Sequence, residues 1–291
     1  SNWRDLEELG LEVKEKRDAA HPEWADYPVF WTNNLVYPYN FAFETFLNDS
    51  YLAVCDIDEF DQIAGVDSSQ VVNFYATDEF REYCIQRQRM VDEGLYAYDY
   101  TDRSDWQYTG AVFGWVGWGY TYMEEHMYGE NFVTKMKISE NLWTETNNYF
   151  SAGTAISSQC AYPEKAMEIL NLVNTDSKVR DAFYYGLEGD NFTYISDNRV
   201  HRNNTEWSMA GYTQGTFFNV TQLDDVDFNQ WDEVKTLNEN AKASVLLGFT
   251  FDPTDYADQI ANCTAIFERY KGELLTGTAD PETTVAAMMK D

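Results

Sequence analysis

The stretch QVVNFYATDEFREYCIQRQRMVDEGLY, residues 70–96, decides the fold class of this chain. Its first residues are apolar and aromatic, as in a strand, and the residues after Thr77 have a helical pattern. Thr77 is expected to cap this helix, with Asp78 and Glu79 at the positive end of the helix dipole and Gly94 as the stop. A strand followed directly by a helix indicates an α/β protein.

Further helices are predicted before and after this unit. The first begins in the opening residues and ends near Pro22, because a proline disfavours helix at the residue before it. Another begins at Pro163, with a buried stripe of Ala166, Ile169, Leu170 and Val173. The last two span residues 257–277 and 280–291, the second of them capped by Asp280.

The charge of the chain excludes one large class of partner. The 291 residues include 20 Lys and Arg against 50 Asp and Glu, a net charge of −30. This charge opposes binding to nucleic acid or to an anionic membrane surface. The sequence also contains no run of 18 apolar residues that would offer a membrane span.

No catalytic or metal-binding motif stands out. The three histidines are far apart in sequence, and DDVDFNQWDEV, residues 224–234, lacks the glycine and the glutamate of a calcium-binding loop. Carboxylate pairs are too abundant here to indicate a glycosidase. We therefore predict no enzyme, no cofactor and no metal. Four scattered cysteines, Cys55, Cys84, Cys160 and Cys263, are predicted to be buried free thiols, with one or two disulfides as the alternative.

The aromatic residues indicate the class of ligand better than the charged residues do. Nine Trp, 21 Tyr and 18 Phe make up 16% of the chain, and their ring faces suit the apolar C–H faces of sugars. In TGAVFGWVGWGYTYM, residues 109–123, Trp115 and Trp118 lie three residues apart on a predicted strand. They would point to opposite faces, so at least one looks away from the main core. The flanking glycines would let a ligand approach the backbone closely.

The order of segments resembles the extracellular solute-binding proteins of ABC importers, particularly the carbohydrate-binding lipoproteins of Gram-positive bacteria. The stretch DAFYYGLEGDNFTYI, residues 181–195, is similar to one of their motifs. Residues 238–289 resemble a C-terminal domain of unknown function found in these lipoproteins. The residues that carry this second match are Gly248, Phe249, Phe251, Asp252, Tyr270, Leu274, Gly277, Asp280 and Pro281.

The resemblance implies an α/β fold of the periplasmic-binding-protein type (type II), with two lobes joined by hinge crossings. Family members are longer, so the chain would correspond to their C-terminal two-thirds. Residues 1–150 would form the first part of the C-terminal lobe, and residues 151–205 a hinge crossing with a returning segment of the N-terminal lobe. Residues 206–291 would complete the lobes.

The resemblance also implies a function and a site. The protein would be the substrate-binding component of an importer, taking an oligosaccharide into the cleft between its lobes and docking on ABC permease transmembrane subunits. It would be a monomer outside the cell, anchored by an N-terminal lipid whose signal and lipobox this chain does not contain. By position, Trp115 and Trp118 match a sugar-stacking aromatic of the family, and Tyr120 is their neighbour.

Three further aromatic residues are site candidates because each lies near an expected strand end or hinge: Trp31, Trp143 and Trp207. Two alternatives stay open at this point. The ligand would be a peptide in the first, and the protein would be a glycan-active hydrolase in the second.

Overall fold

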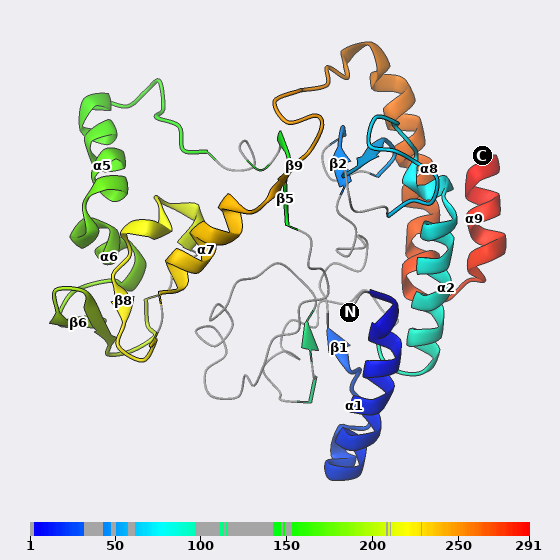
Figure 1. Cartoon of the computed structure of the whole chain (residues 1–291), viewed down its shortest axis with the longest axis horizontal. Coiled ribbons are helices and arrows are strands. Elements are labelled where there is room, and N and C mark those ends of the chain that lie inside the picture. Colours follow the sequence, from blue (N-terminus) through cyan, green and yellow to red (C-terminus); the bar gives the residue numbers. More distant parts are fainter. Residues whose placement is uncertain are drawn as a thin grey trace. The chain divides into compact units, whose positions relative to one another are not determined.

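The computed structural model of this chain is shown in Figure 1. It describes residues 3–31, 43–47, 51–57, 62–96, 111–112, 114–115, 142–146, 148, 153–207, 209, 211–227 and 229–291. The α-helices are α1 (Leu6–Ala20), α2 (Asp78–Asp92), α5 (Pro163–Thr175), α6 (Ser177–Tyr185), α7 (Gln230–Glu239), α8 (Ala257–Thr276) and α9 (Pro281–Lys290). The strands are β1 (Phe30–Trp31), β2 (Phe43–Thr45), β3 (Val54–Asp56), β4 (Gly114–Trp115), β5 (Trp143–Thr144), β6 (Phe192–Ser196), β7 (Arg199–Arg202), β8 (Gln222–Leu223) and β9 (Lys242–Ala243).

The chain divides into two compact units. Unit 1 comprises Ser1–Thr146 and Ala241–Asp291, and unit 2 comprises Asn147–Asn240. The chain thus leaves unit 1 near the predicted boundary at residue 150, whereas the predicted boundary at 205 falls inside unit 2. Which lobe of a longer protein each segment belongs to stays a prediction.

Helix α2 begins and ends where its sequence predicts. The Thr77 hydroxyl oxygen accepts a hydrogen bond from the Phe80 backbone N–H at 3.2 Å, and Gly94 follows the helix with a positive φ of 73°. The strand predicted before it is wrong in extent. Val72 forms only an isolated bridge to Val54, and residues 74–76 form a 3-10 helix. Burial of the aromatic rings in this turn outweighs the strand propensity of its residues.

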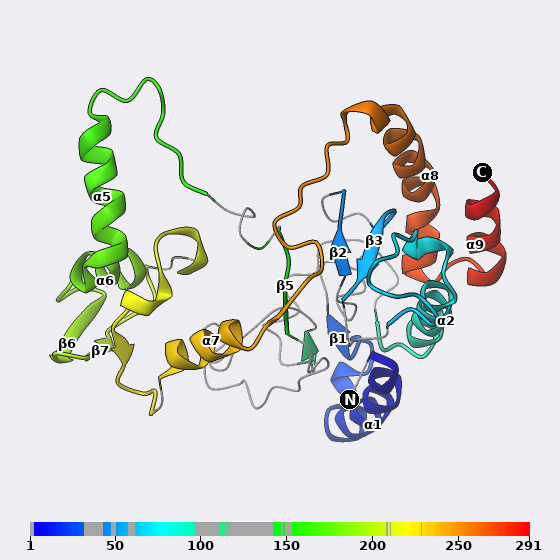
Figure 2. The ribbon, with the colours of Figure 1, turned by 45° about the horizontal axis from the view of Figure 1, so that its top comes forward.

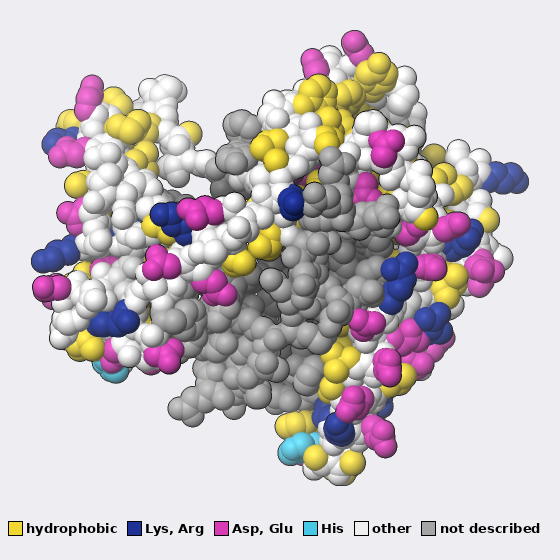
Figure 3. Space-filling model, in the orientation of Figure 1, with side chains coloured by type: hydrophobic (Ala, Val, Ile, Leu, Met, Phe, Trp, Pro, Cys, Tyr) yellow, Lys and Arg dark blue, Asp and Glu magenta, His cyan; other side chains and the backbone are white. Residues whose placement is uncertain are grey.

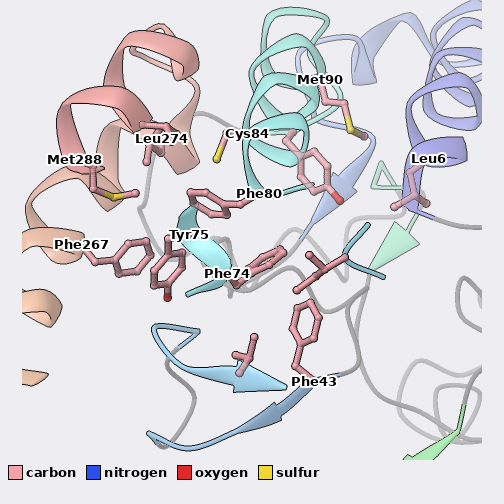
Figure 4. Close-up of a cluster of buried hydrophobic side chains, with 14 of the residues drawn as sticks. Leu6, Phe43, Phe74, Tyr75, Phe80, Cys84, Met90, Phe267, Leu274 and Met288 are labelled. Carbon is pink, nitrogen blue, oxygen red and sulfur yellow. The ribbon is translucent and has the colours of Figure 1, made fainter. Parts of the chain in front are cut away.

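An aromatic core holds unit 1 together. Figures 1 and 2 show α2, α8 and α9 side by side, and Figure 4 shows the rings that lie between these helices and the β2–β3 hairpin. Tyr75 stacks on Phe267 with ring centroids 4.0 Å apart, and Phe74 contacts both Phe43 and Phe80. The core therefore joins residues that are about two hundred positions apart in the sequence.

The C-terminal helices follow their sequence signals. Asp280 caps α9 by accepting a hydrogen bond from the Thr283 backbone N–H at 2.9 Å, and Gly277 ends α8 in the left-handed conformation. In α8, Phe267 and Leu274 of the C-terminal half are buried, whereas Cys263 of the N-terminal half is exposed. The helix therefore packs through its C-terminal half.

Unit 2 is organised around two buried charged residues of α6. Asp181 accepts hydrogen bonds from the Tyr194 hydroxyl at 2.7 Å and from the backbone N–H and hydroxyl of Thr221 at 2.8 and 2.5 Å. Arg180 donates to the carbonyl oxygens of Thr216 and Gly211 at 2.9 and 2.8 Å. These contacts fasten α6 to the sheet β6-β7-β8 and to the loops before β8.

Burial shifts the pKa of both groups. It raises the pKa of Asp181 above the usual aspartate value, although the hydrogen bonds from Thr221 and Tyr194 oppose the shift. It likewise lowers the pKa of Arg180. Both side chains are fully buried, so this polar cluster is the centre of unit 2.

The apolar stripe predicted for α5 is only partly buried. Val173, near the end of the helix that packs on α6, is 2% exposed, whereas Ile169 on the same face is 51% exposed. Ala166 and Leu170 are half-buried. The prediction of a buried stripe is therefore wrong for most of the helix, because the part of unit 2 that the structure describes covers only its C-terminal end.

The four cysteines are unbridged. Cys55 and Cys84 are buried, as predicted, whereas Cys160 is half-buried and Cys263 is exposed. Among the described residues, no helix has the length and apolar character needed to cross a membrane.

Candidate functional site

Two of the predicted site residues lie side by side on paired strands of unit 1. Strand β1 pairs with β4 in parallel, and Trp31 and Trp115 are Cα partners in this register. The two residues are separated by more than eighty positions in the sequence. The fold therefore brings together one tryptophan from the glycine-rich stretch and one predicted only from its place near a strand end.

A buried arginine of α1 holds the segments that lead into both strands. The Arg17 guanidinium donates to the carbonyl oxygens of Tyr27 and Pro28, both at 2.8 Å, and to that of Ala111 at 2.9 Å. Arg17 is 8% exposed, and the Asp18 carboxylate accepts a hydrogen bond from its Nε at 2.9 Å. Hydrogen bonds to a charged donor are stronger than neutral ones. Arg17 thus fixes the spacing of β1 and β4.

Strand β1 is also anchored to the end of α2. The backbone N–H groups of Val29 and Phe30 both donate to the Leu95 carbonyl oxygen, at 3.1 and 2.9 Å. Gly10 lets α1 approach closely, because a Cβ at that position would lie 2.7 Å from the Phe30 ring and 3.0 Å from Leu95. The backbone that carries Trp31 is therefore set by the rigid core.

A third predicted residue, Trp143, lies on a second strand pair of unit 1. Strand β5 pairs with β9 in parallel, with Trp143 opposite Lys242, and the Trp143 side chain is half-buried. Thr146, just beyond β5, ties the strand to the segment after β9. Its hydroxyl donates to the Leu246 carbonyl oxygen at 3.1 Å and accepts from the Gly248 backbone N–H at 3.0 Å.

Trp207 lies in unit 2. Its side chain is 44% exposed, and its indole N–H donates to the Phe183 carbonyl oxygen at 3.0 Å. Trp118 and Tyr120 lie outside the described residues. The structure therefore pairs Trp31 with Trp115, puts Trp143 in the same unit, and puts Trp207 in the other.

Sequence reasoning missed the residues that hold this site. In the sequence, Arg17 looks like an ordinary charged residue in the last turn of an amphipathic helix. Thr146 belongs to no predicted helix, strand or motif. Neither gave a local signal, since their partners are distant in the sequence. Gly10 inside a helical pattern was the one available hint, because glycine there weakens a helix and is kept where packing is close.

The two buried thiols, Cys55 and Cys84, are poorly suited to act as nucleophiles. Burial raises the pKa of Cys84 to about 12, and burial together with the nearby carboxylates of Glu44 and Asp56 raises that of Cys55 to about 11. Both thiols therefore stay protonated near neutral pH. Among the residues that the structure describes, no group of three or more His, Cys, Asp or Glu side chains is arranged to hold a metal ion.

Comparison with known proteins supports the resemblance inferred from the sequence. Residues 245–291 match the family described as "Domain of unknown function (DUF3502)". Over 160 residues the chain is 29% identical to a carbohydrate ABC transporter substrate-binding protein of Streptococcus pneumoniae, a match that covers 53% of this chain and 31% of that protein.

Solved structures match nearly the whole chain. The N-glycan transport solute binding protein NgtS of S. pneumoniae in complex with Man1GlcNAc matches 96% of this chain and 62% of its own, with a TM-score of 0.78 and 22% identity. The same protein in complex with Man5GlcNAc matches 96% of this chain and 61% of its own, with a TM-score of 0.75 and 22% identity.

These matches confirm the predicted resemblance and the predicted fold class. The chain has the α/β periplasmic-binding-protein fold (type II), and its matches span less than a third of the curated relative and about 62% of the solved chain.

Proposed function

We propose that this chain is part of the substrate-binding component of an ABC importer and that its ligand is an oligosaccharide. The observation that carries the proposal is the match of 96% of the chain to the fold of NgtS, solved in complex with two glycans. The sequence match to a carbohydrate ABC transporter substrate-binding protein supports the same ligand class.

The strand pair β1–β4 is the proposed centre of the sugar site. Trp31 and Trp115 are Cα partners there, and the indole ring of tryptophan is a residue type well suited to stacking on the apolar face of a sugar. The backbone is held by Arg17 and Leu95, so the two residues are positioned before ligand binds. Such preorganisation lowers the entropic cost of binding.

The remaining candidates are assigned supporting roles. Trp118 and Tyr120 follow Trp115 in the sequence and extend the same aromatic segment. Trp143 lies on strand β5 of the same unit, and Trp207 of unit 2 is a separate candidate contact. Closure of two lobes around the ligand would bury the sugar, with carboxylate and amide side chains bonding its hydroxyl groups.

The proposed function implies partners and a location for the complete protein. The complete protein would be non-catalytic, would act outside the cell as a monomer held by an N-terminal lipid, and would deliver its ligand to the permease subunits of the importer. The acidic surface favours neutral sugars over anionic ligands, since the net charge is −30.

Titration calorimetry of the complete protein tests the ligand class. Man1GlcNAc, Man5GlcNAc, a maltooligosaccharide and an unrelated peptide mixture would be compared at the same concentrations. We expect saturable heat with at least one glycan and none with the peptides. Binding of peptides alone, or hydrolysis of a chromogenic glycoside that depends on one carboxylate, would overturn the proposal.

A further inference from the structure

Four aromatic residues of unit 1 form a cluster that the site described above does not use. Phe46 contacts Phe249 and Phe251 edge to face, with ring centroids 6.3 Å apart in both pairs, and Phe251 stacks on Tyr256 at 6.0 Å. We refer to Phe46, Phe249, Phe251 and Tyr256 as the aromatic shelf. Three of its members lie in the segment between β9 and α8.

The aromatic shelf is open to solvent. Phe249 is 51% exposed and Tyr256 is 54% exposed, and Leu247 beside them is 40% exposed. Figure 3 shows hydrophobic side chains gathered over the connection between β9 and α8. Single exposed apolar residues are ordinary, but a contiguous aromatic group in a strongly acidic protein indicates a binding surface.

Hydrogen bonds fix the segment that carries the shelf. Thr146 bonds both Leu246 and Gly248, as described above, and its backbone N–H makes a long hydrogen bond of 3.4 Å to the buried Glu44 carboxylate. Glu44 lies on β2, two residues before Phe46. Strand β2, just before Phe46, and the segment after β9 are therefore both bonded to Thr146.

One side of the shelf follows the carboxyl end of a parallel strand. Gly248 and Phe249 lie in the segment after β9. Strand β9 pairs in parallel with β5, which carries Trp143. In open α/β folds, ligands bind beyond the carboxyl ends of the parallel strands.

We propose that the aromatic shelf is a second carbohydrate contact, which stacks on sugar units of a long oligosaccharide beyond those held by the tryptophans. This inference rests on the proposed function and adds a subsite to it. Aromatic faces with no fixed charge suit the C–H faces of neutral sugars. The Asp252 carboxylate accepts from the backbone and side chain of Thr254, which fixes the turn between Phe251 and Tyr256.

Phe249→Ala and Tyr256→Ala test the proposal in the complete protein. Calorimetry would compare Man5GlcNAc with Man1GlcNAc for the parent and each variant. We expect each variant to bind Man5GlcNAc about three- to tenfold more weakly, with little change for Man1GlcNAc, because only the longer glycan reaches the shelf. Phe218→Ala is the matched control, since Phe218 is also 51% exposed but lies in unit 2.

A second measurement separates this proposal from the proposed function. Ring NMR signals of Phe249 and Tyr256, assigned from the Phe249→Leu and Tyr256→Phe variants, would be followed as Man5GlcNAc is added to high concentration. Shifts in these signals support the shelf. Glycan binding that needs Trp115 but leaves both ring signals unmoved overturns the shelf alone, and no glycan effect on any signal overturns both. If Phe249→Ala instead abolishes association between copies of the protein, the shelf is a protein interface and the proposal is wrong.

Discussion

Units 1 and 2 differ in the residues that they bury. Unit 1 buries a continuous set of aromatic rings between α2, α8, α9 and the β2–β3 hairpin. Unit 2 buries the charged pair Arg180 and Asp181 beside its apolar residues and leaves most of the α5 stripe only partly buried. An apolar core gains free energy from burial itself, but a buried charge stabilises only through the bonds that satisfy it. The two units should therefore respond differently to substitution, pH and solvent.

The largest effect is expected in the core of unit 1. Phe74 is fully buried against Phe43 and Phe80, so Phe74→Ala removes a ring and leaves a cavity. We expect a loss of about 3–5 kcal/mol in the free energy of unfolding of unit 1, measured by chemical denaturation. Phe218→Ala, which removes an exposed ring of unit 2, is the control and should cost under about 0.5 kcal/mol.

A smaller effect is expected at the polar centre of unit 2. Asp181→Ala leaves the Tyr194 hydroxyl and both donors of Thr221 without their acceptor. The expected loss is about 1–3 kcal/mol. Hydrogen exchange should locate it in β6 and β8 of unit 2, with the amides of α2 unchanged. Equal loss of protection in α2 would show that the two units do not unfold separately.

Two carboxylates, Glu7 of unit 1 and Asp181 of unit 2, should make the stability depend on pH in opposite directions. Arg89 bonds both oxygens of Glu7, at 2.8 and 2.7 Å, and this lowers the pKa of Glu7. Ionised Glu7 therefore stabilises the folded state fully above the usual glutamate pKa. This stabilisation is lost as the pH falls through the lowered pKa of the folded state. The pKa of Asp181 is raised by burial, so its contribution is full below the usual aspartate pKa and is lost as the pH rises through the raised value.

Denaturation from about pH 7 to about pH 3 would compare the parent with Glu7→Gln and Asp181→Asn. On acidification, the stability advantage of the parent over Glu7→Gln should shrink, and its advantage over Asp181→Asn should grow. Parallel changes for the two variants would contradict the assigned pKa directions.

The smallest effect is expected on the open face of α5. Ile169 is 51% exposed, so Ile169→Asn should change the stability of this chain by no more than about 0.5 kcal/mol. Val173→Asn, on the same face but buried, should cost several times more. A large loss for Ile169→Asn, measured by denaturation of the same chain, would mean that the stripe is buried in solution.

Local signals in the sequence predicted the helices well and their partners poorly. Thr77, Gly94, Asp280 and Gly277 act through bonds or backbone angles within a few residues, so the sequence alone located the ends of α2, α8 and α9. The same reasoning placed the α5 stripe in a core, because periodicity reports which face is apolar but not what covers it.

At the candidate site, too, the sequence predicted individual residues but not their partners. The resemblance identified Trp115 as a candidate, and an expected strand end identified Trp31. Their pairing depends on Arg17 and Leu95, whose bonded partners are too distant in the sequence for a local pattern to predict. Three of the four shelf residues lie within residues 238–289, the stretch that resembles the C-terminal domain, and Phe46 lies outside it. The exposure of the shelf follows from the fold, so no local pattern could have assigned a ligand to these residues.

The most direct test of the central claim is calorimetry of the complete protein with the glycan it binds most tightly, comparing Trp31→Ala, Trp115→Ala and Trp118→Ala. Trp24→Ala is the control, because Trp24 stacks on His21 and belongs to neither strand of the pair. We predict that Trp31→Ala and at least one of the other two variants weaken binding tenfold or more, by about 1.4 kcal/mol, while Trp24→Ala does not. Unchanged affinity in all three variants would contradict the assignment of this strand pair to the sugar site.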